Sequence, residues 1–453
     1  TGEEQDRLER QLTPVTVAFK KARIAQARKG LAGLAKFDRA KMTAAQRNAA
    51  ELMQWQLQLI VDEEPYLDFT FPLEQMNGVN IDLVENMTVR RAIASEKDAE
   101  NYLAALGQVA TRMEDAIAES RRLAAKKVLP PRYILEATVK QMQNFSDPSP
   151  AQNPFALVFA NKLEAVPSIS EARRKELIAS AEKIVGTQIY PAWKKAIAQL
   201  QTQLPLSAND AGLWRFKDGD KAYSYYLHRY TTTNLTAEQI HEIGLRRVKE
   251  IEVQMDELLR KIGRTEGTVK DRIEKLSVDM RYPNPSSEES RAQIMKDIDS
   301  ILADSQRRSA LLFDIRPKTP VVAQPFPRFR EDNAAANYNF PAPDGSRPGV
   351  FQYPRRLNNM TKFGLRSIVY HETVPGHHFH LALQVENKDL PRFEQVRAFG
   401  GLSAITEGWG LYAERLAAES GWYDGDIEGQ LGQLRSEEHT SELQSHLNLV
   451  CRL

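Results

Sequence analysis

The chain has 453 residues, of which 27% are charged, and its formal net charge is +1. At roughly 150 residues per domain, this length predicts two or three domains or one large helical body. The balanced charge argues against nucleic-acid binding and against a polybasic membrane surface. No apolar run approaches the roughly 18 residues that span a bilayer, so we expect neither a nucleic-acid partner nor a membrane span. The single cysteine, Cys451, excludes an internal disulfide framework, and the oligomeric state stays open.

Long stretches of the chain are rich in helix-forming residues and poor in helix breakers. Residues 3–61, 96–127 and 170–204 have this composition, and the third stretch is interrupted near Tyr190-Pro191. We therefore predict a mostly α-helical fold. The segment from 204 to 220 suits a domain boundary, which gives an N-terminal helical region at 1–205 and a second region at 206–434.

A long amphipathic helix is predicted to begin after Thr236. The sequence Thr-Ala-Glu-Gln at 236–239 is a capping-box pattern, and apolar residues follow it at spacings of mostly three and four. His241 and Glu242 lie on the polar flank of this helix. Leu245 takes the position where a second metal-binding histidine would be needed, so we expect the pair to lie at the surface.

Residues 316–354 differ from the helical stretches, because they are rich in proline, asparagine, glycine and aromatic residues. This composition predicts turns and short extended pieces, or a small sheet. An ordered surface loop is the alternative.

Four of the eight histidines lie within residues 371–380, in the sequence His-Glu-Thr-Val-Pro-Gly-His-His-Phe-His. A His-Glu pair followed by another histidine is typical of zinc hydrolases, in which two imidazoles bind the ion and the glutamate polarises a water molecule. Ligands four residues apart share one helix face. Here an unbroken helix would turn His377 about 120° away from His371 and carry His378 roughly 10 Å along the axis.

Pro375 explains this unusual spacing. Proline lacks a backbone N–H and would clash with the carbonyl four residues earlier, and Gly376 permits the dihedral angles needed to resume a helix. If two residues bulge out, His371 and His377 become equivalent to an i, i+4 pair. We therefore predict these two histidines as ligands. His378 is the alternative second ligand, and otherwise it supports the site or faces substrate.

A catalytic zinc site also needs a third protein ligand and an open position. Residues 406–416, Thr-Glu-Gly-Trp-Gly-Leu-Tyr-Ala-Glu-Arg-Leu, predict a helix with Glu407 and Glu414 on one face. Glu407, beside Gly408, is the predicted third ligand, and Glu414 is predicted to orient a ligand histidine. The alternative for Glu414 is an ion pair with a nearby arginine on a solvated face.

The segments 371–378 and 406–416 resemble those of the large, mainly bacterial domain-of-unknown-function family 885, which is similar to the gluzincin metallopeptidases. Residues 227–244 also resemble this family, and the likeness covers most of residues 1–434. It implies a large zincin-like body of helices, with a short extended or small-sheet segment before the metal-binding helix. Gluzincins place Gly-His shortly after His-Glu, and the same placement points here to His377. The resemblance also favours an extracytoplasmic location, periplasmic or lipoprotein-anchored.

Residues 435–445 are identical to the in-frame translation of a common sequencing-library adapter. We therefore predict that residues 435–453 are a non-native tail. The family resemblance implies further helices after Leu434, including an Asp-Thr-Gly-x-His-like segment. Because this chain lacks that segment, we expect a formed metal site with poor or absent turnover.

Together these residues predict a zinc-dependent metallopeptidase. Zn²⁺ held by His371, His377 and Glu407 would lower the pKa of a bound water toward roughly 7. Glu372 would take the proton of that water as it attacks the scissile carbonyl, and would then deliver it to the leaving amine.

The predicted partner is a peptide substrate. Arg347 and Tyr338 are candidate substrate contacts, because zinc peptidases commonly place a substrate-pairing strand just before the metal motif. Two alternatives remain from the sequence: a zinc hydrolase of another amide or ester, and a helical binding protein that retains metal without catalysis.

Overall fold

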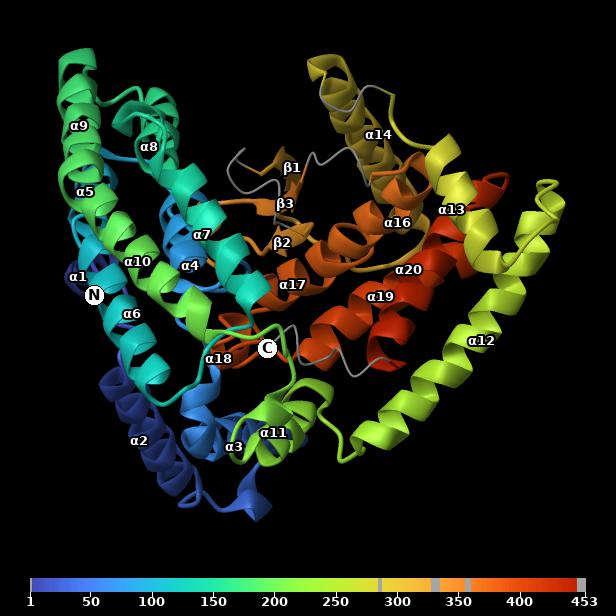
Figure 1. Cartoon of the computed structure of the whole chain (residues 1–453), viewed down its shortest axis with the longest axis horizontal. Coiled ribbons are helices and arrows are strands. Elements are labelled where there is room, and N and C mark those ends of the chain that lie inside the picture. Colours follow the sequence, from blue (N-terminus) through green and yellow to red (C-terminus); the bar gives the residue numbers. More distant parts are fainter. Residues whose placement is uncertain (1, 284–286, 327–334, 355–359, 446–453) are drawn as a thin grey trace. The chain divides into compact units, whose positions relative to one another are not determined.

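The computed structural model describes residues 2–283, 287–326, 335–354 and 360–445 (Figure 1). The chain divides into two compact units, Thr1–Ala222 and Tyr223–Leu453. The boundary predicted after residue 205 precedes this division. The described residues form helices and one three-stranded sheet, which confirms the mostly α-helical fold class. None of the helices in these ranges has the length and apolar composition that a bilayer crossing requires.

The first unit is built from helices, as its composition predicts. The predicted interruption near Tyr190-Pro191 is a π-helical turn, Val185–Ile189, and Pro191 lies in the first turn of the next helix, where a missing N–H costs no hydrogen bond. The helices of this unit are α1 (Gly2–Glu9), α2 (Val17–Leu34), α3 (Ala44–Asp62), α4 (Val79–Glu85), α5 (Glu96–Leu106), α6 (Val109–Ala125), α7 (Arg132–Ser146), α8 (Pro154–Glu164), α9 (Glu171–Ile184) and α10 (Tyr190–Gln203).

The second unit carries the predicted metal site. Its first helix, α11, includes the boundary between the units. The elements are α11 (Gly219–Thr231), α12 (Ala237–Lys261), α13 (Val269–Asp279), α14 (Glu288–Leu312), β1 (Val321–Pro325), β2 (Asn337–Asn339), β3 (Gly349–Tyr353), α16 (Lys362–Glu372), α17 (His377–Glu386), α18 (Arg392–Gln395), α19 (Ser403–Glu419) and α20 (Ile427–Ser445).

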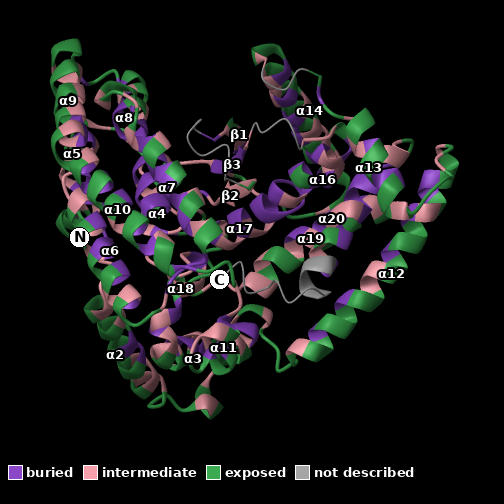
Figure 2. Cartoon of the chain, viewed as in Figure 1, coloured by how far each residue is buried: buried purple, intermediate pink, exposed green. Residues whose placement is uncertain are grey.

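Helix α12 begins where the sequence predicts it. The Thr236 hydroxyl accepts a hydrogen bond from the Gln239 amide, and the Gln239 side chain accepts one from the Thr236 amide, so both halves of the capping box are present. Much of α12 is exposed in Figure 2, in keeping with its polar flank. His241 and Glu242 are exposed, which confirms their predicted surface position.

The small sheet lies in the segment that the sequence predicts to be extended. Strand β3 is central, with β1 parallel to it on one side and β2 antiparallel on the other. Every residue of β3 is buried, as expected for a central strand covered on both faces. The predicted sheet before the metal-binding helix is therefore confirmed, and the alternative of a surface loop is wrong for the described residues.

Helix α16 lies between two apolar clusters, and Figure 2 shows its buried character. Leu365 and Val369 pack in one cluster with residues of α14, β1 and β3. Phe363 packs in the other with residues of α12, α13 and α20. Because α16 packs on both sides, the backbone that carries the His371 imidazole, near the C-terminal end of the helix, is firmly held.

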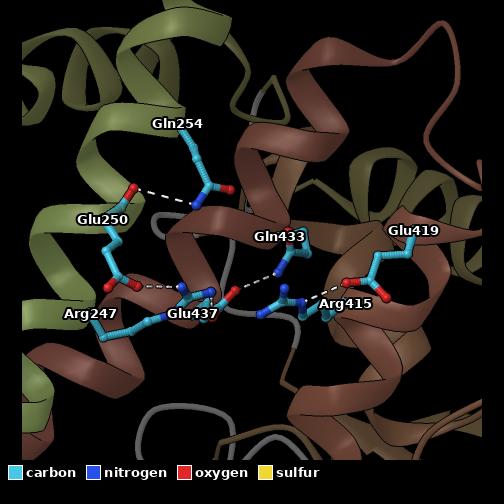
Figure 3. Close-up of polar contacts among 7 residues, drawn as sticks. All are labelled: Arg247, Glu250, Gln254, Arg415, Glu419, Gln433 and Glu437. Atoms are coloured by element: carbon cyan, nitrogen blue, oxygen red, sulfur yellow. Dashed lines mark hydrogen bonds and ion pairs between the residues drawn. The ribbon is translucent and has the colours of Figure 1, made fainter.

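Helix α20 packs against α12 and α16 and continues past Leu434 to Ser445. In Figure 3 the Arg247 guanidinium of α12 points to Glu437 of α20, and its Nε donates to the Glu437 carboxylate over 2.8 Å. Gln433 donates to the same carboxylate over 3.1 Å. The predicted tail is therefore helical over 435–445, and Glu437 within it packs against α12. Its adapter origin stays a prediction, and Cys451 lies outside the described residues.

Candidate metal centre

The predicted break in the metal-binding helix lies between α16, which ends at Glu372, and α17, which begins at His377. The Gly376 amide donates to the Tyr370 carbonyl over 3.0 Å, and the Phe379 amide donates to the Thr373 carbonyl over 3.2 Å. Both bonds span six residues where a regular helix spans four. Two extra residues are thus accommodated, and the expected bulge is confirmed.

The bulge brings His371 and His377 together, with Glu407 of α19 beside them. Ligand atoms of these three residues all lie within 4.8 Å of one another. The Glu407 Oε2 atom is 3.5 Å from His371 Nε2 and 3.6 Å from His377 Nε2. The structure therefore gathers the three residues that the sequence predicts as ligands.

These distances fit a tetrahedral cation. Zinc–nitrogen and zinc–oxygen bonds of about 2.0–2.1 Å at tetrahedral angles put neighbouring ligand atoms roughly 3.3–3.4 Å apart. The two separations from Glu407 exceed this by a few tenths of an ångström, and all three ligand atoms lie within 4.8 Å of one another, so rotations of the side chains would close the site. Two imidazole nitrogens and one carboxylate oxygen are a donor set that zinc accepts, and they leave a fourth position open. The Glu407 side chain is 62% exposed, so this position can be reached from solvent.

Glu414 holds the first imidazole from behind. Its Oε1 atom lies 2.7 Å from His371 Nδ1, and its other oxygen accepts a hydrogen bond from Ser367. The carboxylate favours the tautomer with the proton on Nδ1, which leaves Nε2 free for a metal. Glu414 is buried, so the alternative of an ion pair with an arginine on a solvated face is wrong among the described residues.

The charges around the two imidazoles favour a cation. Burial opposes a charge on His371, but hydrogen bonds to Glu407 and Glu414 outweigh it and raise the pKa of this histidine to about 10. Desolvation by neighbouring protein atoms opposes ionisation of Glu407 although its side chain is largely exposed, but the adjacent His371 and His377 imidazoles outweigh this effect and lower the Glu407 pKa. Without metal a proton balances the carboxylates, and a divalent ion at the same place would replace it.

Glu372, the predicted base, is buried beside this cluster. Its Oε2 atom has no hydrogen-bond partner among the described residues. Burial raises the pKa of its carboxyl, and the neighbouring His371 and His377 partly offset this effect. An unpaired buried carboxylate oxygen costs free energy unless a ligand or water forms a hydrogen bond with it. The free Oε2 atom is therefore suited to accept a proton.

His378 turns to a different environment from the ligand cluster. Its Nδ1 atom lies 2.9 Å from the Tyr338 hydroxyl of β2, and burial lowers the pKa of its imidazole to about 4. Gly349 makes room for this pair, because a Cβ there would lie 2.4 Å from the hydroxyl and 2.7 Å from the imidazole. The Arg347 guanidinium donates to the Phe340 carbonyl over 2.7 Å. Tyr338 and Arg347 thus make contacts that stabilise the local structure around β2 and β3.

Three residues support the cluster that the sequence analysis did not single out: Ser367, Trp409 and Gly410. The Trp409 indole donates to the Pro375 carbonyl over 2.9 Å and so ties α19 to the bulge. Gly410 lies against the His371 ring. Helical spacing in the sequence could have indicated two of them. Ser367 precedes His371 by one helical turn, and Gly410 shares a face with Glu407 and Glu414.

Replacement of Gly410 by alanine is expected to weaken metal binding. The new Cβ would lie 2.6–3.0 Å from atoms of the His371 imidazole, so the ring must move. We expect a roughly 10- to 100-fold loss of zinc affinity, as for other disturbances of ligand orientation, measured by competition with a chelator. Gly408→Ala is the matched control, because nothing lies within 4 Å of its Cβ position. Equal zinc affinities of the two variants would contradict this role for Gly410.

Solved structures with the same fold come from other bacteria. A protein from Colwellia psychrerythraea, described as a "putative lipoprotein", is 27% identical with a TM-score of 0.89, and the match covers 97% of this chain and 76% of that one. A "putative lipoprotein of unknown function" from Shewanella oneidensis is 15% identical with a TM-score of 0.59, covering 96% and 77%. The latter likeness shows the fold alone. The search among proteins with curated descriptions returned no match.

The sequence itself matches one family along nearly its whole length. The family is described as "Bacterial protein of unknown function (DUF885)", and residues 1–441 match. The resemblance seen in segments 371–378 and 406–416 is thereby confirmed. This chain belongs to the DUF885 family of bacterial proteins.

Proposed function

We propose that this protein is a zinc-dependent metallopeptidase. The observation that carries the proposal is the cluster of His371, His377 and Glu407, with ligand atoms within 4.8 Å of one another, beside the buried carboxyl of Glu372. The Glu414 carboxylate, which contacts His371 Nδ1, and the open fourth coordination position also support the proposal. Helices held by two apolar clusters give the site the rigid base that catalysis needs.

In this proposal each residue has one role. His371, His377 and Glu407 hold the ion, and Glu414 fixes the tautomer and orientation of His371. Bound zinc supplies a Lewis acid that activates water and polarises a carbonyl. Glu372 accepts a proton from the attacking water and returns it to the leaving amine. Burial, which raises the Glu372 pKa, brings this carboxyl closer to the pKa range in which one group can both take and give a proton.

The direct test combines metal analysis with a peptide digest. The purified chain is expected to contain about one zinc per molecule, and a chelator should remove both the zinc and the hydrolysis of a peptide mixture. Products are followed by mass spectrometry over long incubations. Cleavage of esters with no cleavage of peptides would contradict the proposed substrate class.

Glu414→Gln tests the support behind the first ligand. The amide keeps the shape of the side chain but removes the negative charge that stabilises the Nδ1–H tautomer of His371. Zinc affinity is expected to fall by roughly 10- to 100-fold, measured by chelator competition. Glu419→Gln is the control, since Glu419 lies on the same helix and pairs with Arg415 in the solvent-exposed part of α19. An unchanged affinity in Glu414→Gln would remove Glu414 from the site.

We also propose an extracytoplasmic location. The two structural relatives carry the word lipoprotein in their descriptions, and lipid-anchored proteins of this kind are held at a membrane surface rather than through it. Fractionation of cells that express the native protein checks this. Recovery with the cytoplasmic contents would contradict it.

A further inference from the structure

Arg397 is a half-buried cation next to the metal-ligand cluster. It follows α18, and its guanidinium donates to the Thr406 hydroxyl over 3.1 Å. Thr406 directly precedes the ligand Glu407, whose carboxylate lies between the two histidines. The charge of Arg397 also acts on His380 of α17. The guanidinium is therefore bound to the residue that precedes a proposed ligand, and the charge of Glu407 acts on it.

No carboxylate neutralises this arginine within the described ranges. Burial lowers the pKa of Arg397, and the charge of Glu407 only partly offsets that effect. No carboxylate oxygen in these ranges lies within the 4.0 Å of an ion pair, because Glu407 itself is directed to His371 and His377. A partly desolvated guanidinium without an acidic partner is unfavourable by itself. An anionic ligand would supply the missing partner.

The surrounding residues hold the guanidinium in place. A Cβ at Gly401 would lie 1.5 Å from Arg397 Nη2, so a larger residue there would displace the guanidinium from this position. The Phe340 ring, which follows β2, lies 5.8 Å from the guanidinium carbon. Arg397 has a backbone φ of 49°. Residues other than glycine rarely adopt this conformation, and it is often found at functional sites.

We propose that Arg397 binds the C-terminal carboxylate of the peptide substrate. This inference rests on the proposed function, and it makes the enzyme a carboxypeptidase. Arginine suits this task, because its planar fork matches both oxygens of a carboxylate.

Binding to the full chain tests this proposal without relying on turnover. Zinc-loaded Glu372→Gln protein is titrated calorimetrically with a peptide that ends in a free carboxylate and with the same peptide ending in an amide. We expect about 10- to 100-fold tighter binding of the free acid, the range of a charged hydrogen bond. Arg397→Gln should abolish this preference, and Arg397→Lys should retain part of it. Arg392→Gln, an exposed arginine of α18, should leave the preference unchanged.

A second variant guards against a simple loss of folding. Gly401→Ala keeps the positive charge but displaces the guanidinium, so it should weaken binding of the acid peptide and spare the amide. Both variants are compared with the parent by thermal denaturation. Equal affinity of the parent for acid and amide would overturn the proposal. Peptides with Glu or Gln at an internal position provide a second check. The proposal would also be overturned if affinity depended on the internal glutamate side chain and not on the C-terminal carboxylate.

Turnover separates this proposal from the proposed function. If the protein with Glu372 intact cleaves acid and amide peptides with the same kcat/KM, the carboxylate site is wrong and the peptidase stands. If peptide cleavage persists after removal of zinc while the binding preference depends on Arg397, the zinc peptidase is wrong and the carboxylate site stands. The pattern expected is cleavage of the acid, with Arg397→Gln raising KM far more than it lowers kcat.

Discussion

Replacement of His371 by alanine is expected to remove stoichiometric zinc from the protein. His371 supplies one of three ligand atoms within 4.8 Å, and its loss leaves two ligands and removes the imidazole partner of the buried Glu414 carboxylate. Since structural and catalytic zinc sites use three or four protein ligands, zinc content should fall from about one per chain to near zero, measured by elemental analysis after gel filtration. Glu407→Ala should have the same effect.

Two other histidines give this experiment its controls. His241→Ala alters the exposed His-Glu pair of α12 and should leave one zinc per chain. His378→Ala distinguishes the two predicted second ligands, because His378 Nδ1 is held by Tyr338 outside the ligand cluster. Loss of zinc in His378→Ala with retention in His377→Ala would reverse the ligand assignment. Retention of zinc in His371→Ala would refute the site.

The second large effect is expected for Glu372→Gln, which should keep the metal and lose the chemistry. Glu372 is buried beside the ligands but is not one of them, so zinc content should stay near one per chain. Glutamine cannot take a proton from water, and removal of a general base typically lowers kcat by about 10²- to 10⁴-fold. The rate of peptide hydrolysis under saturating substrate measures this loss.

Glu242→Gln is the matched control for this second experiment, because it makes the same change in the exposed His-Glu pair. It should have the activity of the unaltered protein. Undiminished hydrolysis by Glu372→Gln would contradict the role of this residue as base. Loss of zinc together with activity would show that its role is structural.

The local features of the site could be predicted from the sequence, because they depend on residues that are neighbours along the chain. Capping at Thr236 needs only the following turn of helix. The two-residue bulge at Pro375 follows from the missing amide of proline and the spacing of the histidines. Glu407 and Glu414 share a face because seven residues complete nearly two turns. Each of these expectations rests on backbone geometry that varies little between proteins.

The tertiary structure decided which side chains meet across helices. Packing of α19 against α16 puts Gly410 on the His371 ring and Ser367 on Glu414. The sheet, not the ligand cluster, takes His378, because Gly349 opens a space for Tyr338 beside it. Such contacts depend on the shapes of packed surfaces, for which helical periodicity carries no information.

By itself the sequence therefore determined the helical class, the break between α16 and α17 and the three candidate ligands that the structure brings together. Tertiary packing alone decided how these residues are oriented and which charges they face. Arg397 carries no signal in the sequence, because a single arginine in a loop has no distinctive pattern. Its place beside Thr406 and Gly401 arises because the segment after α18 approaches the start of α19. Burial removes water from around a charge and so strengthens its electrostatic interactions.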